Sequence, residues 1–413
     1  MLSDCIMQCR KRNFFILSCV LCAALILTLA VESGSTFLLH SIQSQSFGKT
    51  EKLQLLQAQG IEDPQLFLSE GAELYWGRPE YHPTRWYSLP RNFRGKYHAT
   101  DDYGMRVPTE SEPASAVPLA NNKVGFFGGS TAYSTVTDFH HAIPAFISRL
   151  SHGKIATENM GIGGYSTSAE LPLLIESLRR FAGRFDTIIF YDGVNEVFRE
   201  LERNQSKQDA PWIRDLGFPY EASTHSALLR QAVPLLFNSS SFQLMDYAMR
   251  AYKLRSLVSS VGTTGGIDLQ SSADTIARTY WANVHDIKAI CESHAIICYF
   301  ILQPTLYHRQ AKSDWELTVY NARHRTLLDI SELFSKAYES IRSNIPENLK
   351  QDFLDMSGIL NDCLPGKSIF YDECHLLNVG NECVARRLYN ELFKDKPPLS
   401  HSEHESRLRG GNT

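Results

Sequence analysis

The chain lacks an excess of charge of either sign. Its 413 residues include 41 Lys and Arg against 45 Asp and Glu, which gives a net charge of −4. Proteins that bind nucleic acid electrostatically carry a basic face, so we expect no nucleic-acid partner. Hydrophobic residues make up 43% of the chain, as in an ordinary globular protein, and the length suffices for one large domain or two smaller ones.

The sequence also lacks the usual marks of a metal site. It contains no HExxH motif and no pair of CxxC motifs. Cys19 and Cys22 form one CxxC pattern, but they lie within an apolar run, where a redox role is not expected. We therefore expect neither a metal nor an organic cofactor.

An uncharged apolar run of eighteen residues, 14–31, lies near the N-terminus. As a helix it spans roughly 27 Å, enough to cross a bilayer core. Three basic residues precede it and Glu32 follows it, so the positive-inside rule places residues 1–13 in the cytoplasm and the remainder outside. A cleaved signal peptide is the alternative. The run is long for that purpose and "ESGSTFLLH" offers a poor cleavage site, which favours an uncleaved signal anchor.

Five of the nine cysteines fall on the exported side of this run. They are Cys291, Cys298, Cys363, Cys374 and Cys383. Disulfides persist outside the cytoplasm, and an odd number leaves at least one thiol free or paired with another chain. Cys363 and Cys374 could close a loop, but the spacing leaves the connectivity open.

Composition divides the exported part of the chain. Residues 32–120 predict a stalk followed by an aromatic-rich segment of short strands and turns. Residues 121–393 predict one α/β domain. Within it, 199–272 predicts a helical insertion that either covers the site as a lid or only adds packing. The polar tail, 394–413, predicts disorder.

The alternation of segments within the domain sets the expected fold class. Strands that alternate with helices favour a three-layer α/β sandwich with a parallel sheet. The run "DTIIFY" is mostly apolar, as expected of a strand buried on both faces. The expected strands are 123–127, 154–159, 186–191 and 295–301, and the expected helices are 138–150, 167–181, 273–294, 315–343 and 380–393.

Polar or glycine-rich clusters follow three of these strands, and a fourth cluster precedes the last helix. They are "GGST" at 128–131, "NMGIGGYSTS" at 159–168, "DGVNE" at 192–196 and "YDECHLLNVG" at 371–380. Ligands of an open parallel sheet bind beyond the carboxyl ends of its strands. We therefore expect the four clusters to meet at one rim of the sheet.

These clusters contain the groups that acyl transfer needs. Ser130 stands at a strand-to-helix corner, with the N-terminus of the following helix behind it to favour negative charge. His375 can take the serine proton, and Asp372, three residues earlier, can hold the imidazole in the required tautomer. The backbone N–H groups of Ser130 and Gly164, with the side-chain amide of Asn195, can stabilise the oxyanion.

In this order the blocks resemble the SGNH, or GDSL-type, hydrolases. "GGST", "NMGIGG", "GVNE" and "DECH" match that family's serine block, glycine block, G-x-N-D block and late D-x-x-H, over about 121–393. The resemblance implies a flavodoxin-like sandwich. It gives the roles described above to five residues: Ser130, Gly164, Asn195, Asp372 and His375.

Two blocks depart from the family pattern. The first reads GGST rather than GDSL, and the third ends in Glu196 rather than Asp, but both keep the essential Ser and Asn. The aromatic-rich segment ahead of "FFGGST" is similar to membrane-tethered bacterial members of the family.

We therefore expect a membrane-anchored serine esterase that faces the extracytoplasmic side and hydrolyses an acyl ester, for example an O-acetyl ester, without a cofactor. Its expected partners are a small acyl ester or an acylated glycan and, through residues 14–31, the membrane. One alternative is an O-acyltransferase that uses the same triad and passes the acyl group to an exported glycan. The other is a non-catalytic surface binding or assembly protein.

Overall fold

The computed structural model describes most of the chain after residue 47. The described residues are 31, 32, 34, 48–77, 80–110, 122–180, 183–206, 268–326 and 330–394. The chain divides into two compact units, and residues 50–216 with 266–413 form the larger one. That unit holds every element named below, apart from the first residue of α2. The other unit, 1–49 with 217–265, includes few described residues.

Three predicted segments lie largely outside the described residues. They are the signal anchor at 14–31, the insertion at 199–272, of which only 199–206 and 268–272 are described and belong almost wholly to α7 (Val194–Ser206) and α11 (Leu269–Ser293), and the tail at 394–413. The anchor, the lid and the disordered tail therefore stay predictions. Within the described ranges, none of the helices combines the length and the apolar character needed to cross a bilayer.

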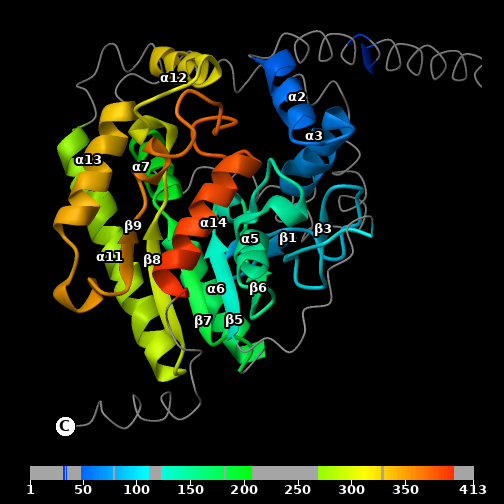
Figure 1. Cartoon of the computed structure of the whole chain (residues 1–413). Coiled ribbons are helices and arrows are strands. Elements are labelled where there is room, and N and C mark those ends of the chain that lie inside the picture. Colours follow the sequence, from blue (N-terminus) through cyan, green and yellow to red (C-terminus); the bar gives the residue numbers. More distant parts are fainter. Residues whose placement is uncertain are drawn as a thin grey trace, which may run out of the picture. The chain divides into compact units, whose positions relative to one another are not determined.

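A seven-stranded sheet forms the centre of the larger unit (Figure 1), in the order β3-β4-β6-β5-β7-β8-β9. From β6 to β9 in this order, adjacent strands run parallel to one another. β7 is buried along its whole length, as its apolar sequence predicts. The strands are β3 (Ala99–Thr100), β4 (Arg106–Val107), β5 (Asn122–Gly128), β6 (Ile155–Asn159), β7 (Thr187–Asp192), β8 (Ile297–Leu302) and β9 (Phe353–Asp355).

The sheet is mixed rather than purely parallel, which corrects the sequence prediction. β3 and β4 pair antiparallel with each other, and β4 pairs antiparallel with β6 through Arg106 and Asn159. Both strands come from the aromatic-rich segment, so this segment and residues 121–393 share one sheet. Strands of two residues carry no readable periodicity, and the sequence does not predict the three-residue β9 for the same reason.

Helices cover both faces of the sheet and give three layers. Residues of β7 alternate between two hydrophobic cores, with Ile188 and Phe190 in the first and Ile189 and Tyr191 in the second. The first core also includes residues of α6 (Thr167–Arg180), α7 (Val194–Ser206), α11 (Leu269–Ser293) and α13 (Ile330–Ser343). The second includes residues of α5 (Ile143–Leu150), α12 (Asp314–Thr326) and α14 (Asn378–Leu392). Figure 1 shows α5 and α14 in front of the strands.

Two predicted helices are interrupted in the structure. The segment 315–343 forms α12 and α13 rather than one helix. The segment 138–150 forms the 3₁₀ turn η2 (Phe139–His141) and then α5, with Pro144 in the first turn of α5 as predicted. The remaining short elements of this part are α4 (Ser130–Tyr133), η3 (Leu306–His308), η4 (Glu347–Leu349) and η5 (Ile359–Asn361).

The residues predicted as stalk and aromatic-rich segment pack against the α/β body. They form α2 (Lys49–Ala58), α3 (Pro64–Ala72), the π-helical turn η1 (Glu73–Gly77) and the hairpin of β1 (Glu80–His82) and β2 (Trp86–Ser88). A third hydrophobic cluster joins Leu56 and Phe67 of this segment to Tyr371 and Leu377. Those last two residues flank the predicted Asp372 and His375, so α2 and α3 support the loop that carries them.

Two disulfides link helices to neighbouring segments. Cys291 of α11 pairs with Cys298 of β8, and Cys363 pairs with Cys383 of α14. The pairing of Cys363 with Cys374 that the spacing allowed is therefore wrong. α14 packs against η5, which brings Cys383 to Cys363, while Cys374 is free and buried.

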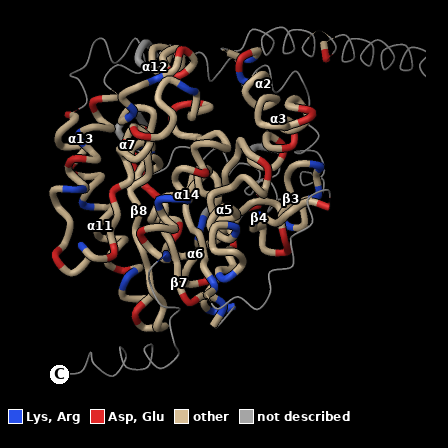
Figure 2. Tube along the Cα trace, in the orientation of Figure 1, with Lys and Arg blue, Asp and Glu red and all other residues tan. Residues whose placement is uncertain are grey.

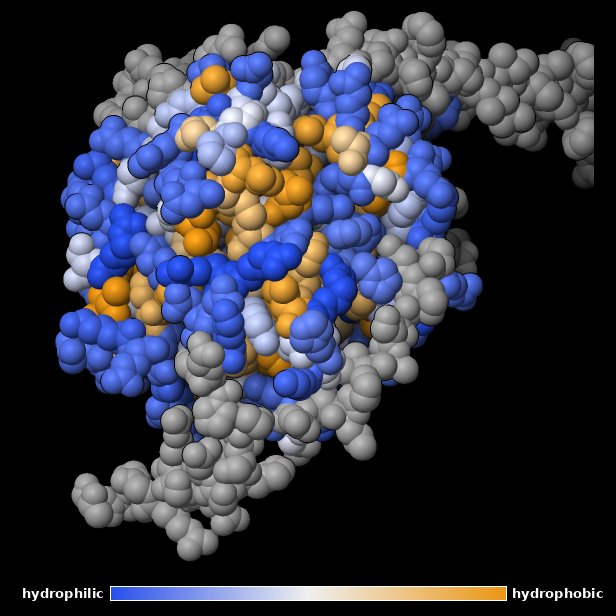
Figure 3. All heavy atoms as spheres, viewed as in Figure 1, coloured by the Kyte–Doolittle hydropathy of each residue, from blue (hydrophilic) through white to orange (hydrophobic). Residues whose placement is uncertain are grey.

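The surface of the described elements mixes charges of both signs. Figure 2 shows Lys and Arg interspersed with Asp and Glu along the trace. Figure 3 shows apolar side chains gathered among hydrophilic ones on one face. Large apolar side chains that stay exposed in the described residues include Leu317 on α12, Leu364, and Val379 on α14.

Candidate active site

The corner that carries Ser130 is built from the central strand of the sheet and two glycines. β5 ends at Gly128, and Ser130 begins the four-residue helix α4. Gly128 has a φ of +150°, and a Cβ there would lie 2.5 Å from the Ala132 Cβ and 2.8 Å from the Tyr191 carbonyl oxygen. Glycine is therefore required at this turn. Because α4 is so short, the expected support from a helix dipole is small, and individual N–H groups must serve instead.

Ser130, His375 and Asp372 form one hydrogen-bonded chain, called the triad below. His375 Nε2 lies 2.7 Å from Ser130 Oγ, and His375 Nδ1 lies 2.7 and 2.9 Å from the two Asp372 carboxylate oxygens. Asp372 Oδ1 also accepts the backbone N–H groups of His375, at 2.8 Å, and Cys374, at 3.0 Å. The carboxylate is thus fixed by backbone donors and orients the imidazole with Nε2 towards the serine.

The charges of Asp372 and His375 stabilise each other. Burial raises the pKa of Asp372, but the charge of His375 and the hydrogen bonds from His375 and Cys374 outweigh burial and hold that pKa below its ordinary value. Burial lowers the pKa of His375, but the Asp372 carboxylate outweighs it and holds that pKa well above its ordinary value. An imidazolium formed by taking the serine proton is therefore stabilised at this position.

Asn195 lies beside the serine corner. It is the second residue of α7, and its Nδ2 donates to the Tyr165 carbonyl oxygen at 2.5 Å. A Cβ on Gly129 would lie 2.1 Å from that Nδ2, so the amide reaches the residue directly before Ser130. An asparagine amide has two N–H groups, and the Tyr165 contact uses one of them. The backbone N–H of Ser130, at the start of α4, has no intrahelical acceptor.

Gly164 lies in the turn after β6, which is held from two sides. Its φ is +77°, and a Cβ there would lie 2.7 Å from the Tyr87 hydroxyl. Tyr87 of β2 donates that hydroxyl to the Gly163 carbonyl oxygen, and Arg199 of α7 donates to the Gly164 carbonyl oxygen. The aromatic-rich segment thus helps to position one of the predicted oxyanion donors.

Arg106 and Asn159 hold the C-terminal end of α4. The Arg106 guanidinium, in a residue only 3% exposed, donates to the carbonyl oxygens of Ser134 at 2.8 Å and Thr137 at 2.7 Å. Asn159 Nδ2 donates to the Ala132 carbonyl oxygen at 3.1 Å. The last carbonyls of a helix have no intrahelical donor, so these two side chains complete the corner from its far end.

Helix α12 holds the loop of residues 369–377, called the histidine loop below, which carries Asp372 and His375. The buried Glu316 carboxylate accepts the backbone N–H groups of Ile369 at 2.8 Å and Phe370 at 3.0 Å. It also forms an ion pair with Arg309, with Nε and Oε2 3.0 Å apart. The loop therefore depends on a charged side chain that lies more than fifty residues away in sequence.

Helix α2 is followed by a second support for the histidine loop. Gln59 Oε1 accepts the backbone N–H of Asn378, directly after the loop, at 2.6 Å. Lys52 Nζ lies over the Tyr371 ring, 5.3 Å from its centroid. The loop is thus held between α12 and the N-terminal segment.

The arrangement around His375 favours proton transfer over metal binding. Asp372, Cys374 and His375 offer three possible ligand atoms within 4.8 Å of one another. Burial raises the pKa of the Cys374 thiol to about 12, so the thiol keeps its proton at neutral pH. A thiol ligates metal as the thiolate, and His375 Nδ1 is already engaged by Asp372, so these residues do not fit a metal ion.

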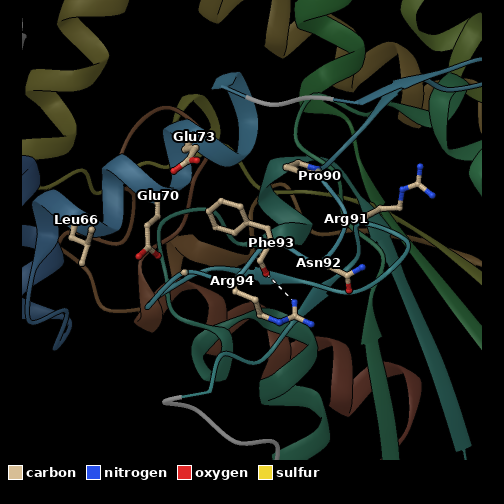
Figure 4. A pocket seen from close by; sticks show the side chains of 9 residues that line it. Leu66, Glu70, Glu73, Pro90, Arg91, Asn92, Phe93 and Arg94 are labelled. Atoms are coloured by element: carbon tan, nitrogen blue, oxygen red, sulfur yellow. Dashed lines mark hydrogen bonds between the residues drawn. The ribbon is translucent and has the colours of Figure 1, made fainter. Parts of the chain in front are cut away.

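A hollow of about 400 Å³ lies apart from the triad, between α3 and the loop before β3 (Figure 4). Glu70 lines it and accepts backbone N–H groups of Lys96 and Tyr97, both at 2.8 Å. Arg94 also lines it and donates to the Phe93 carbonyl oxygen. None of the lining residues belongs to the triad, and these polar groups serve the fold around them.

The structure brings the predicted site residues together. His375 is in direct contact with both Ser130 and Asp372, and Asn195 and Gly164 lie on segments that contact one another beside the corner. Their catalytic roles stay predictions. Gln303, directly after β8, accepts the Thr131 hydroxyl at 2.6 Å.

Sequence reasoning missed the residues that support the site. Arg106 and Gln59 lie in residues 32–120, which the sequence predicts as a stalk and an aromatic-rich segment, and Glu316 lies in an ordinary helical pattern. No motif marks them, because each acts on backbone groups distant in sequence. Asn159 could have been found from the sequence, since it is the last residue of β6 and opens the glycine block.

No family model and no curated protein matches the sequence. Solved structures that are similar include an acetyl xylan esterase, AlAXEase, at 13% identity and a TM-score of 0.34, covering 66% of this chain and 100% of that one. A member of the lipolytic protein G-D-S-L family from Veillonella parvula has 12% identity, a TM-score of 0.34, and coverage of 66% and 99%. A carbohydrate acetylesterase family member from Sinorhizobium meliloti has 14% identity, a TM-score of 0.32, and coverage of 65% and 96%. At this level the likeness alone assigns neither a family nor an activity to this chain.

Proposed function

We propose that this chain is a serine ester hydrolase that acts through Ser130, His375 and Asp372. The observation that carries the proposal is the continuous hydrogen-bonded chain from Asp372 through both imidazole nitrogens to Ser130 Oγ, which lies 2.7 Å from Nε2. A serine hydroxyl is a weak nucleophile unless a base takes its proton, and His375 stands at the required distance. The resemblance of the four sequence blocks to the SGNH hydrolases supports the same assignment.

The proposed reaction follows from this geometry. As Ser130 Oγ attacks the acyl carbon, His375 Nε2 takes the hydroxyl proton, and Asp372 stabilises the imidazolium. The N–H groups of Ser130 and Gly164 and the Asn195 amide stabilise the oxyanion of the tetrahedral intermediate. His375 then gives its proton to the leaving alcohol, and the acyl-enzyme forms. Water attacks that ester in the same way, His375 again takes and returns the proton, and a carboxylic acid and free Ser130 result.

We place this unit outside the cytoplasm, tethered through residues 14–31. The apolar run with its preceding basic residues supports the tether. The two disulfides, Cys291–Cys298 and Cys363–Cys383, support an oxidising compartment, because cytosolic thiols are normally kept reduced. The substrates we propose are small acyl esters or acylated glycans, with O-acetyl esters among them.

Hydrolysis of p-nitrophenyl acetate by the detergent-solubilised full chain tests the proposal. We expect turnover by the wild type and a loss of at least about 1,000-fold in kcat for Ser130→Ala. Ser335→Ala, which changes an exposed serine on α13, is the matched control and should keep the wild-type rate.

Each other outcome speaks against the proposal in its own way. Turnover that survives Ser130→Ala excludes this serine as the nucleophile. A folded wild type without any turnover excludes hydrolysis of this simple ester, and it favours the acyltransferase or the binding protein. Transfer of acetyl to an added glycan in place of release as free acid identifies the acyltransferase.

A further inference from the structure

The first turn of α7 holds the turn that carries Gly164 against the corner that carries Ser130. Asn195 donates to the Tyr165 carbonyl oxygen, as described above. The next residue, Glu196, accepts the backbone N–H of Thr167, at the start of α6, at 2.9 Å. Its other carboxylate oxygen accepts the N–H of Gly193, also at 2.9 Å. The position of α6 relative to α7 therefore sets the position of the Gly164 turn relative to the Asn195 amide.

Two further carboxyl groups lie at this junction of α6, α7 and β7. Glu170 of α6 is 0% exposed and Asp192, the last residue of β7, is 3% exposed. Glu170 lies one turn after Thr167, and Asp192 directly precedes Gly193, so the two contacts of Glu196 bring these carboxyl groups together at the junction. Within the part of the chain that the structure describes, no N–H or O–H donor reaches either Glu170 oxygen or Asp192 Oδ2. Two ionised carboxylates in contact at such a place would repel each other without compensation, whereas a proton between them satisfies both.

We infer that Glu170 and Asp192 hold at least one proton between them at neutral pH, and that this carboxyl pair joins α6 to the end of β7 and so positions Gly164 against Asn195. Both are positioning residues, because neither contacts Ser130 or His375. The catalytic consequence of the contact rests on the proposed function, while the shared proton does not.

The surrounding groups favour the protonated pair. Burial, the largest cause, raises the pKa of Glu170 to about 8 and raises that of Asp192 well above its ordinary value. Glu196 of α7 adds a nearby negative charge that acts in the same direction. Tyr280 faces the pair from α11, and burial raises its pKa well above its ordinary value, so it stays neutral. Arg199 lies near Glu196 and engages the Gly164 carbonyl oxygen.

The pH dependence of unfolding of the full chain tests the shared proton. The folded pair keeps its proton at pH values where the unfolded chain has lost it, so stability falls as pH rises towards the folded pKa. The unfolding constant should rise by about tenfold per pH unit for each proton retained, between the ordinary glutamate pKa and about pH 8. Glu170→Gln cannot ionise, and its amide can donate to Asp192. For this variant we expect the logarithm of the unfolding constant to rise less steeply with pH than in the wild type, by the equivalent of at least one retained proton.

A matched control is Glu292→Gln, an exposed position on α11 that should reproduce the wild-type slope. Asp192→Asn provides a second variant with the same expected loss of slope, which covers the case that Glu170→Gln fails to fold. Equal slopes for the wild type and whichever of these variants folds would overturn the shared proton.

Ester hydrolysis tests the positioning role. We expect Glu170→Gln to keep kcat within about threefold of the wild type at pH 7, because the amide preserves the contact. Glu170→Ala should lower kcat by about tenfold or more with little change in KM, because the oxyanion donors move while the substrate still binds. An alanine variant as active as the wild type would overturn the positioning role. A wild type without turnover would contradict the proposed function. The pH dependence of unfolding would still test whether Glu170 and Asp192 share a proton.

Discussion

The serine corner and the histidine loop meet at a 2.7 Å hydrogen bond, but they are built in opposite ways. The corner follows the central strand of the sheet, and its shape comes from glycines at 128 and 129 and a tight turn into α4. The histidine loop is irregular and takes its shape from side chains of α12 and from Gln59 after α2. The serine is thus fixed mainly by local backbone geometry, with Arg106 and Asn159 holding the end of α4, whereas the histidine loop is held mainly by distant side chains.

The difference explains where each part is vulnerable. At the corner, any added atom meets backbone or buried groups that cannot move, as at Gly128. At the loop, loss of one support leaves the others in place. Glu316 accepts the Ile369 N–H, Trp315 donates to the Tyr371 carbonyl oxygen, and Gln59 accepts the Asn378 N–H. Substitutions at the corner should therefore be severe, whereas single substitutions that support the loop should be graded.

Removal of His375 should have the largest effect on kcat, because it removes the hydrogen bond that joins the histidine loop to the serine corner. We expect His375→Ala to lower kcat for p-nitrophenyl acetate by about 1,000-fold, because no other described base contacts Ser130 Oγ. Fold content measured by circular dichroism should be unchanged. His285→Ala, 71% exposed on α11, should keep the wild-type rate. Equal losses in both variants would contradict the role of His375.

A side chain at the corner should be the next most damaging change. Gly128→Ala places a Cβ 2.5 Å from Ala132 at a φ of +150°, and we expect kcat to fall by about 100-fold and the free energy of unfolding by about 3 kcal/mol. Denaturant unfolding and the esterase assay measure the two effects. Gly183→Ala shares a positive φ of +73° but has open space around it, so it should cost only about 1 kcal/mol and leave kcat unchanged.

The pH profile reports on the coupling between Asp372 and His375. Because Asp372 raises the pKa of His375, kcat/KM should rise by about tenfold per pH unit on its acid limb, with a midpoint above the ordinary histidine pKa. The raised pKa of His375 also stabilises the folded state at pH values below the ordinary histidine pKa. This stability is lost as pH rises through the pKa of His375 in the folded state. Asp372→Asn should move the kinetic midpoint down and lower the maximum rate. An unchanged midpoint would show that the Asp372 carboxylate does not raise the pKa of His375.

Loss of the α12 support should give an intermediate effect on activity. Glu316→Gln weakens two backbone contacts to the histidine loop and leaves Arg309 without its charged partner. We expect the free energy of unfolding to fall by about 3 kcal/mol and kcat by several-fold. The exposed pair of Glu347 and Lys350 supplies the control, since Glu347→Gln should change little. A kcat equal to that of the wild type would show that α12 does not position the loop.

The smallest effect is expected at the end of α2. Gln59→Ala removes the acceptor of the Asn378 N–H, and we expect about 1 kcal/mol of lost stability and a twofold to threefold fall in kcat. Gln57→Ala, exposed on α2, should change neither value. If the two variants behave alike, the N-terminal segment supports the loop only through apolar packing of Leu56 and Phe67.

The outcome of the sequence predictions follows the same division. The parallel strands β5, β6, β7 and β8 lie close to their predicted positions. β5, β7 and β8 are largely apolar runs bounded by polar residues, whereas only the first two residues of β6 are apolar. β3, β4 and β9 are too short to leave a pattern, so the mixed character of the sheet is visible only in the fold. Cys383 as the partner of Cys363 depends on where α14 packs, which spacing does not report.

The sequence by itself determined the four blocks, their order and their places after strands or before the last helix, because glycines, apolar runs and turn residues act over a few neighbours. Only the tertiary structure decided which groups meet. Ser130 and His375 are 245 residues apart, and Glu316 acts on Ile369 across 53 residues. The proximity of Glu170 and Asp192 likewise depends on Glu196, which links the start of α6 to Gly193 directly after β7. Such contacts depend on the distance between elements in the folded chain, and no local pattern encodes that distance.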